Sequence, residues 1–457
     1  METLSAYLRS TSAAPVRLEQ PVRTDFFGSD VRYYAIIDGH AVVATGVRPL
    51  AKLLGKATLN PEALLQSLSQ GLVLRDETVL REVRSIPPHS TLHPDGSLTE
   101  QEGPRAEPRL SDAAEAVRRL RGLLADVLAS LEPRFREHLA GFTGGRDSRI
   151  LAALPKGRPG AWRWLSVSGQ GDAEHLGAQL YAGKLGLRLE WTEWTRAFLE
   201  GGVHRVSAEL ASGVGAISDY TLLRSAFEPR DAPTAALWIG TLADALIAGT
   251  FLAPAANLHE ALSPRTAHLA RVLAQPLLEE LPAQLDWLRA QHGDPRVLRL
   301  LSRGRAFVCK ALASLDRVCE TQVNPYLHES IVELGLQLDP RLLASDALRT
   351  GLLQELGPGL DGPSAFGYRA PAYGLLVLRA LQAEARLCQP LERVLQPALL
   401  DSIRAGSFPE LSTEGPVSTY RIHDESQPVL RSLRDYEHLL TYATFLNLLS
   451  EDGVAIG

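Results

Sequence analysis

The stretch that decides the fold of this protein is Thr143-Gly144-Gly145-Arg146-Asp147-Ser148. It lies where a short apolar run ends and a helical pattern begins. Two consecutive glycines allow a tight turn that brings backbone N–H groups to an anion without obstruction by Cβ atoms. The helix that follows adds unpaired donors and the positive end of its dipole. Thr143 and Ser148 can offer hydroxyl groups to phosphate oxygens, so the stretch predicts a phosphate-binding loop.

Asp147 extends this prediction to a metal ion. A carboxylate repels bare phosphate, so its place in the loop predicts Mg²⁺ between Asp147 and a polyphosphate. The alternative is an ordinary tight turn with a helix N-cap, for which Gly-Gly and Asp-Ser are common. The loop lacks the lysine and the spacing of a Walker A motif, which argues against a P-loop NTPase.

The sequence around the loop alternates between strands and helices. Strands are expected at residues 138–142, 162–168, 187–191 and 235–239, and helices at residues 111–131, 148–154, 172–185 and 197–211. This order predicts an α/β fold with a parallel sheet covered by helices. From about residue 250 to the end, helical periodicity dominates.

The amino-terminal part has a different pattern. Residues 32–46 alternate around Asp38-Gly39 and residues 91–98 surround Asp95-Gly96, two signals of β-hairpins. Residues 61–71 have helical spacing, so this part is expected to be a small α+β domain. A polar stretch with two prolines follows at residues 100–108 and is typical of a linker. The predicted units are therefore a domain at 1–98, a linker at 99–110 and a second domain at 111–457.

Composition narrows the classes of function. The chain has 457 residues, 45% of them hydrophobic and 22% charged, and a formal net charge of −6, which gives no electrostatic footprint for nucleic acid. The basic run at residues 118–121 lies in a helical pattern and indicates a solvated face. No apolar run reaches the roughly 18 residues of a membrane-spanning helix, and no secretion signal opens the chain. A cytoplasmic protein with no membrane or nucleic-acid partner is expected.

Cysteines give no sign of a metal or disulfide framework. Cys309, Cys319 and Cys388 are far apart and form no Cys/His cluster, so buried thiols are the expected state.

Residues 143–148 resemble the S-G-G-x-D-S pyrophosphate loop of the ATP pyrophosphatases, with Thr143 in place of the first serine. Residues 240–249 resemble the S-G-E-G-x-D-E-L-x-x-G-Y segment of the asparagine-synthetase branch, with Gly240 and Asp244 at matching positions. The resemblance implies ATP and Mg²⁺, with the metal held by Asp147 and Asp244. A helix-capping role is the alternative for Asp244. Thr241 and Ala245 replace two acidic residues of the family segment, which leaves the role of catalytic base vacant or filled from elsewhere.

Three further segments carry the resemblance. Residues 172–175 are similar to the acidic segment after the second sheet strand, whose backbone frames adenine in the family. That role falls here on Leu165, Ser166, Val167 and Ser168. Residues 324–328 are similar to R-x-P-F-L-D, without its arginine and aspartate.

Residues 366–371 are similar to K-x-x-F-x-x-P, whose lysine contacts pyrophosphate in the family. No lysine follows Lys310 in this chain, so Arg369 is the candidate replacement. An exposed loop arginine is the alternative interpretation.

The amino-terminal part resembles the glutaminase (Ntn-type) domain of the same family. The pattern is the hairpin at residues 33–46, then Arg48-Pro49-Leu50, and later Ile86-Pro87-Pro88. Active members need a cysteine directly after the initiator methionine, as nucleophile. Position 2 is Glu2 and the first cysteine is Cys309, so glutamine hydrolysis is not expected.

The resemblance as a whole is closest in character to β-lactam synthetases and lasso-peptide cyclases. It implies an AMP-forming carbon–nitrogen ligase that adenylates a substrate carboxylate and forms an amide with an amine, often on the same molecule, as in a lactam or peptide macrolactam of natural-product biosynthesis. The substrate would be a small molecule or a peptide, and a precursor peptide or biosynthetic protein is a possible partner. Two alternatives stay open: a scaffold or binding protein of the same fold without catalysis, and an RNA-modifying ATP pyrophosphatase.

Overall fold

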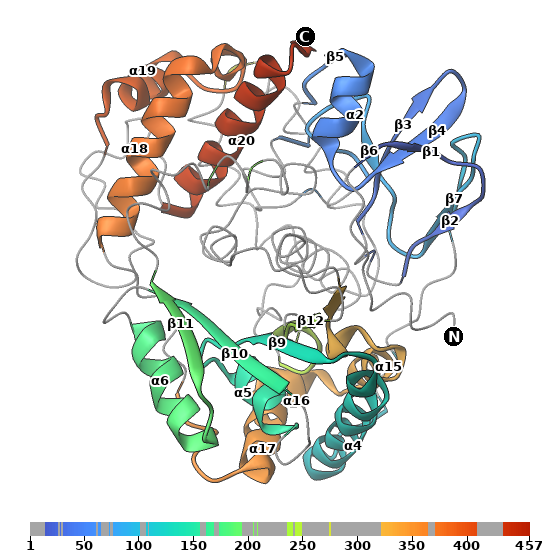
Figure 1. Cartoon of the computed structure of the whole chain (residues 1–457), viewed down its shortest axis with the longest axis vertical. Coiled ribbons are helices and arrows are strands. Elements are labelled where there is room, and N and C mark those ends of the chain that lie inside the picture. The colour runs from blue at the N-terminus through green and yellow to red at the C-terminus, as the bar shows by residue number, and fades with distance from the viewer. Residues whose placement is uncertain are drawn as a thin grey trace.

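Figure 1 shows the chain as a computed structural model. The structure describes residues 14–25, 28, 31–60, 63–64, 73, 76–100, 107, 109–155, 161–168, 173–193, 204, 208, 235–240, 243–248, 274–275, 321–363, 371–408 and 433–457. The expected helix at 197–211 lies outside these residues except for two positions, as does most of the expected helix at 61–71.

Five strands form a sheet in the lower half of Figure 1. Their spatial order is β11 (Leu189–Glu193), β10 (Ala161–Ser168), β9 (Glu137–Gly141), β12 (Ala235–Trp238) and β13 (Thr321–Val323). Every neighbouring pair runs parallel, which confirms the predicted parallel sheet. β13 departs from the expected helical pattern after residue 250, because three residues are too few to show an alternating period.

Helices pack on this sheet and on one another. They are α4 (Ala113–Leu131), α5 (Arg146–Ala153), α6 (Ala173–Leu185), α10 (Ala243–Leu246), α15 (Glu329–Gln337), α16 (Pro340–Ala344) and α17 (Ala347–Leu356), with 3₁₀ turns η1 (Glu132–Arg134) and η4 (Pro325–Leu327). Asp112 caps α4, since its carboxylate accepts the N–H of Glu115 at 2.9 Å. The arginines of residues 118–121 are exposed, so the predicted solvated face is confirmed.

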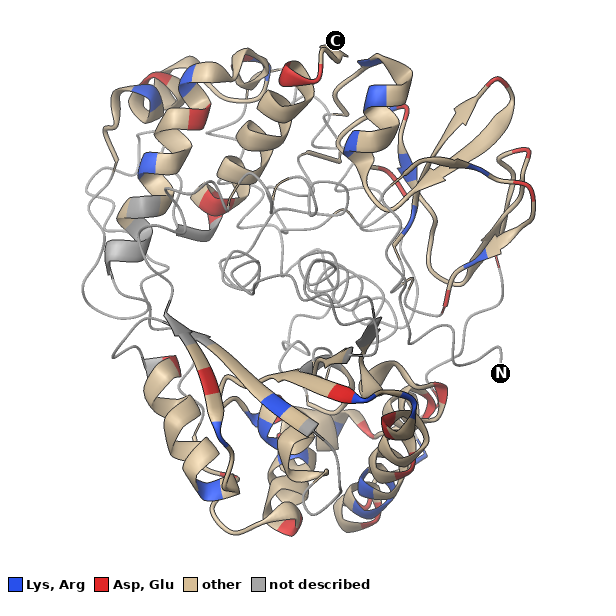
Figure 2. Cartoon of the chain, viewed as in Figure 1, with Lys and Arg blue, Asp and Glu red and all other residues tan. Residues whose placement is uncertain are grey.

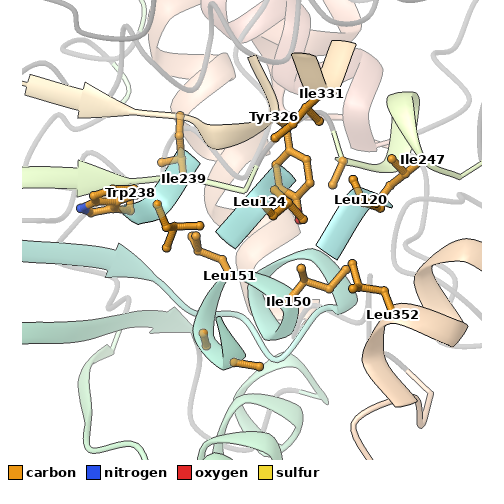
Figure 3. Packing of buried hydrophobic residues seen from close by; sticks show 14 of the residues in the cluster. Leu120, Leu124, Ile150, Leu151, Trp238, Ile239, Ile247, Tyr326, Ile331 and Leu352 are labelled. Atoms are coloured by element: carbon orange, nitrogen blue, oxygen red, sulfur yellow. The ribbon is translucent and has the colours of Figure 1, made fainter. Parts of the chain in front are cut away.

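The buried cluster beneath the sheet holds α5 in place (Figure 3). Its residues come from strands, helices and the turn η4, and include Leu120, Leu124, Ile150, Leu151, Trp238, Tyr326, Ile331 and Leu352. Ile150 and Leu151 of α5 are essentially inaccessible to solvent. The amino terminus of α5, which carries the predicted phosphate loop, is therefore fixed by packing on the body of its helix.

Antiparallel pairing dominates the amino-terminal part, as predicted. One sheet has the order β1 (Val16–Arg17), β4 (His40–Ala44), β3 (Tyr33–Ile37) and β6 (Arg84–Ser85), and another β2 (Val22–Arg23), β7 (Ser90–Leu92) and β8 (Leu98–Glu100). Asp38 and Gly39 turn the first hairpin with φ of 51° and 75°, values that a type I′ turn requires. Gly96 has φ of 84° in the second. Both predicted hairpins are confirmed.

A second buried cluster joins this amino-terminal part to the end of the chain. The elements involved are α2 (Val47–Leu54), α18 (Pro371–Leu387), η5 (Gln389–Arg393), α19 (Pro397–Ala405) and α20 (Leu433–Glu451). Leu50 packs in one core with Leu381, Leu400 and Leu446, and these elements lie together in the upper half of Figure 1. The strands β5 (Lys56–Ala57) and β14 (Ala455–Ile456) also pair in parallel. The predicted division into a domain at 1–98, a linker at 99–110 and a domain at 111–457 stays a prediction. The hydrophobic core of this upper half includes residues from both predicted domains.

Charges of both signs are interleaved along the described elements (Figure 2). Among the described residues, no helix combines the length and apolar character needed to cross a bilayer.

Leu50 tests the shared core. We expect Leu50→Ala to lower the free energy of unfolding by about 2–5 kcal/mol, because it leaves a cavity in the hydrophobic core that α2 shares with the carboxyl-terminal part. Leu53 lies on the same helix with 55% of its surface exposed, and Leu53→Ala should change stability by less than about 0.5 kcal/mol. Denaturant unfolding followed by circular dichroism measures both. Equal losses in the two variants would contradict the assignment of Leu50 to this core.

Arg48 gives a prediction that depends on pH. Its Nε and Nη2 donate to the two carboxylate oxygens of Asp452 at 2.6 and 3.0 Å, and these hydrogen bonds hold the pKa of Asp452 below its ordinary value. A carboxyl group whose pKa is lower in the folded state than in the unfolded state stabilises the fold at pH values above the unfolded pKa of about 3.9. This stabilisation is lost as pH falls through the folded pKa. We expect Arg48→Met to cost about 1 kcal/mol at pH 7 and nothing once Asp452 is protonated. Unfolding curves between pH 7 and pH 3 measure this, and the cost of the substitution should begin to shrink as pH falls below about 3.9. A cost independent of pH would show that Arg48 acts through packing alone.

Candidate functional site

The predicted phosphate loop joins β9 to α5. Gly144 adopts φ of 70° and Gly145 is the N-cap of α5, with extended backbone. The hydroxyl of Thr143 accepts the N–H of Gly145 at 3.2 Å, and the hydroxyl of Ser148 donates to the carbonyl of Gly145 at 2.9 Å. The two hydroxyl oxygens lie 3.4 Å apart. Glycine backbone, two hydroxyls and a helix amino terminus therefore meet at one point, a combination suited to an oxyanion.

Gly144 has no room for a side chain. A Cβ at this position would lie 2.5 Å from the carbonyl carbon of Gly177 and 2.6 Å from the nitrogen of Ala178, both in α6. Together with the positive φ, this contact makes glycine necessary at position 144. The backbone of α6 therefore presses directly against the loop and fixes its shape.

The carboxyl ends of the neighbouring strands reach the same place. β10 pairs with β9 only as far as Leu165, whose carbonyl accepts the N–H of Phe142 at 2.7 Å. Residues 166–168 of β10 continue beyond β9 and pair with β11, so their other backbone edge runs beside the loop. On the far side of β9, a Cβ at Gly240 would lie 3.3 Å from the carbonyl oxygen of Asp147. The loop thus sits between two strand ends, where open parallel sheets bind ligands.

Asp147 belongs to a chain of four charged residues. Its carboxylate lies 3.3 Å from Nη1 of Arg349, whose Nε lies 2.6 Å from the carboxylate of Asp346. Asp346 also forms an ion pair with Arg146 of the loop. All four side chains are between 13% and 28% exposed, so the interactions are only partly screened by water.

Tyr326 lies beneath this charged group. Its hydroxyl is buried and has no hydrogen-bond partner among the described residues. Burial raises the pKa of Tyr326 well above its ordinary value, and the negative charge of Asp147 acts in the same direction. Asn324, at the N-cap of η4, accepts the N–H of Tyr326 at 3.1 Å. The segment resembling R-x-P-F-L-D therefore supplies a buried aromatic side chain near Asp147, and Asn324 caps the 3₁₀ turn that holds it.

Arg149 anchors α5 from its other side. Its guanidinium is fully buried, donates to the carbonyls of Leu360 and Gly362, and lies 3.8 Å from the ring centre of Tyr181 in α6. Desolvation lowers the pKa of Arg149. The loop is thus held between α6 and residues 360–362.

The structure brings most of the sequence-predicted residues together. Thr143, Gly144, Gly145, Asp147, Ser148, Leu165, Ser166 and Gly240 lie at adjacent strand ends, and the strand that frames them continues through Val167 and Ser168. Asp244 is in the short helix α10, which begins three positions after Gly240. Arg369 and Thr241 lie outside the described residues.

The sequence analysis gave no role to four residues of the site. Arg146 and Tyr326 lie inside the segments 143–148 and 324–328, whereas Asp346 and Arg349 lie in no motif. Arg349 contacts Asp147 across 202 positions of sequence, a separation over which no periodicity or motif operates. The motif itself contained Arg146, at its variable position.

A metal ion would find a limited set of protein ligands here. Among the described residues, no group of three or more His, Cys, Asp or Glu side chains could hold one. The Asp147 carboxylate is a partly exposed oxygen donor beside the phosphate loop, which suits Mg²⁺ bound mainly through phosphates and water.

Comparisons with known proteins give a coarse likeness. No protein-family model and no curated protein matches the sequence. Among solved structures, the chain is similar to an NMN synthetase from Francisella tularensis, at 12% identity over 44% of this chain and 97% of that one, with a TM-score of 0.23. It is also similar to an NH3-dependent NAD synthetase from Campylobacter jejuni subsp. jejuni NCTC 11168 in complex with a nitrate ion, at 13% identity over 44% and 96% of the two chains, with a TM-score of 0.22. Likeness at this level assigns neither family nor activity, so the function is inferred from the geometry of the site.

Gly144 provides a direct test of the loop. We expect Gly144→Ala to destabilise the protein by about 2 kcal/mol or more, because it combines a disfavoured φ with a clash against the backbone of α6. Gly183 lies in α6 with nothing within 4 Å of its Cβ position, so Gly183→Ala should be neutral or stabilising by up to about 1 kcal/mol. Thermal unfolding measures both variants. A Gly144→Ala protein as stable as the wild type would contradict the close contact.

Proposed function

We propose that this chain is an ATP-using, AMP-forming carbon–nitrogen ligase of the asparagine-synthetase type that works without glutamine hydrolysis. The observation that carries the proposal is the loop at residues 143–148, placed between the carboxyl ends of β10 and β12. Its necessary glycine, its paired hydroxyls and the start of α5 suit a polyphosphate. Adenine would lie along the backbone edge of residues 166–168 that faces away from β11.

The chemistry proposed has two steps. A substrate carboxylate attacks the α-phosphorus of ATP, and the bond to the β-phosphate oxygen breaks to release pyrophosphate. An amine then attacks the carbonyl carbon of the acyl-adenylate, AMP leaves, and the amine gives up one proton as the amide forms. The loop binds and orients the phosphates so that the carboxylate approaches in line, and its N–H groups and hydroxyls stabilise charge on the leaving group. In the proposal the amine belongs to the same small molecule or peptide.

Mg²⁺ is the cation proposed for this site, held by Asp147 and Asp244 with the phosphates. When bound, it would neutralise charge on the phosphate oxygens. The amino-terminal part is proposed to be a glutaminase-like domain that has lost its nucleophile, since position 2 is Glu2.

An ATP–pyrophosphate exchange assay with a panel of amino acids, small carboxylates and peptides tests the proposal. We expect exchange that depends on one class of carboxylate. Asp147→Asn and Asp244→Asn should each reduce it about 100-fold or more, and the double variant should be little worse, because the two act as a unit. Asp401 is an exposed carboxylate in α19, in the upper half of Figure 1, so Asp401→Asn is the matched control and should exchange normally.

Two outcomes would replace the proposal. ATP binding without exchange for any carboxylate would favour a non-catalytic scaffold of the same fold. Transfer of AMP to RNA in place of a carboxylate would favour an RNA-modifying ATP pyrophosphatase.

A further inference from the structure

A polyphosphate at the proposed nucleotide site needs cations to neutralise its charge, and lysines are scarce in this part of the chain. None follows Lys310, and Lys184 of α6 donates to the carbonyl of Gly359. Among the described residues, the cations joined by ion pairs to the phosphate loop are Arg146, within it, and Arg349 of α17. Arg349 is the one supplied from a distant part of the chain.

The two carboxylates that hold Arg349 do so unequally. Nε of Arg349 lies 2.6 Å from Asp346, a short charge-assisted contact, whereas Nη1 lies 3.3 Å from Asp147. Both partners of the short contact belong to the start of α17, three residues apart. Asp346 is thus the anchor of the guanidinium, and Asp147 is its looser partner.

The side chain of Asp346 serves the ion pairs of the site and does not cap its own helix. It occupies the N-cap of α17, yet its side chain makes no capping hydrogen bond. Its φ is 55°, in the left-handed region, which aspartate and asparagine adopt more readily than other non-glycine residues. Its carboxylate contacts Arg146 and Arg349 at once. The carboxylate of Asp346 is therefore used for the two arginines and not for capping its own helix.

We infer that Arg349 is the cation that binds the β- and γ-phosphates of the nucleotide, positioned by Asp346 and exchanging its contact with Asp147 for one with phosphate. This inference rests on the proposed nucleotide site and goes beyond it by naming the residue. A guanidinium offers five N–H donors in a planar fork. Nε stays on Asp346 while the Nη groups turn from Asp147 to the phosphate oxygens. The exchange also releases the Asp147 carboxylate from its ion pair when the nucleotide arrives.

The inference predicts a loss of affinity that follows the phosphates. For Arg349→Met we expect ATP and inorganic pyrophosphate to bind about 10- to 100-fold more weakly, because a charge-assisted contact is removed. AMP lacks these phosphates, so its affinity should change less than about two-fold. Asp346→Asn keeps a residue that tolerates left-handed backbone but removes the anchor, and should weaken pyrophosphate binding about 3- to 10-fold with AMP unchanged. Isothermal titration of the full chain in magnesium-containing buffer measures all three ligands.

Two controls keep the test decisive. Arg341 pairs with Asp339 on α16 and is 91% exposed, so Arg341→Met should bind every ligand as the wild type does. Arg349→Lys retains the charge without the fork and should lie between the wild type and Arg349→Met; it also serves if the methionine variant fails to fold. Equal pyrophosphate affinity in wild type, Arg349→Lys and Asp346→Asn would overturn the role of Arg349 and leave the nucleotide site intact. A wild-type chain that binds neither ATP nor pyrophosphate would overturn both.

Discussion

The parallel pairing of β9 with β10 on one side and β12 on the other is the constraint on which the rest of the structure depends. Parallel strands end at a common edge, so the residues that follow them come together whatever their separation in sequence. The loop after β9, residues 166–168 and Gly240 meet at this edge for that reason. The backbone contact at Gly144 and the buried guanidinium of Arg149 then fix the loop against α6 and residues 360–362.

Ion pairs connect the charged side chains at this edge of the sheet. Two arginines and two aspartates alternate in one chain of ion pairs, so the group has no net charge of its own and its members hold one another in place. The partly buried position of all four side chains strengthens these interactions relative to a surface pair.

The upper half of the molecule links the two ends of the chain. Leu50 of α2 shares a core with α18, α19 and α20, and the last residues pair with β5. The ion pair of Arg48 with Asp452 joins the same two parts. Packing of this kind couples the stability of the amino-terminal part to residues more than 300 positions away, although the polar stretch at 100–108 marks a change of pattern in the sequence.

Short-range patterns determined much of this protein. Alternation and periodicity predicted the parallel sheet, α4 to α6 and both hairpins, because hydrophobic spacing and turn chemistry act within a few residues. They shifted element ends by one or two residues and missed β13, which is too short to show a period. Glycines and hydroxyls marked residues 143–148 as a candidate phosphate loop for the same local reason. Only the tertiary structure placed Arg349, Asp346 and Tyr326 beside Asp147, because contacts across about 180 to 200 positions arise when separate helices pack on one sheet, and no local rule encodes which charged side chains then meet.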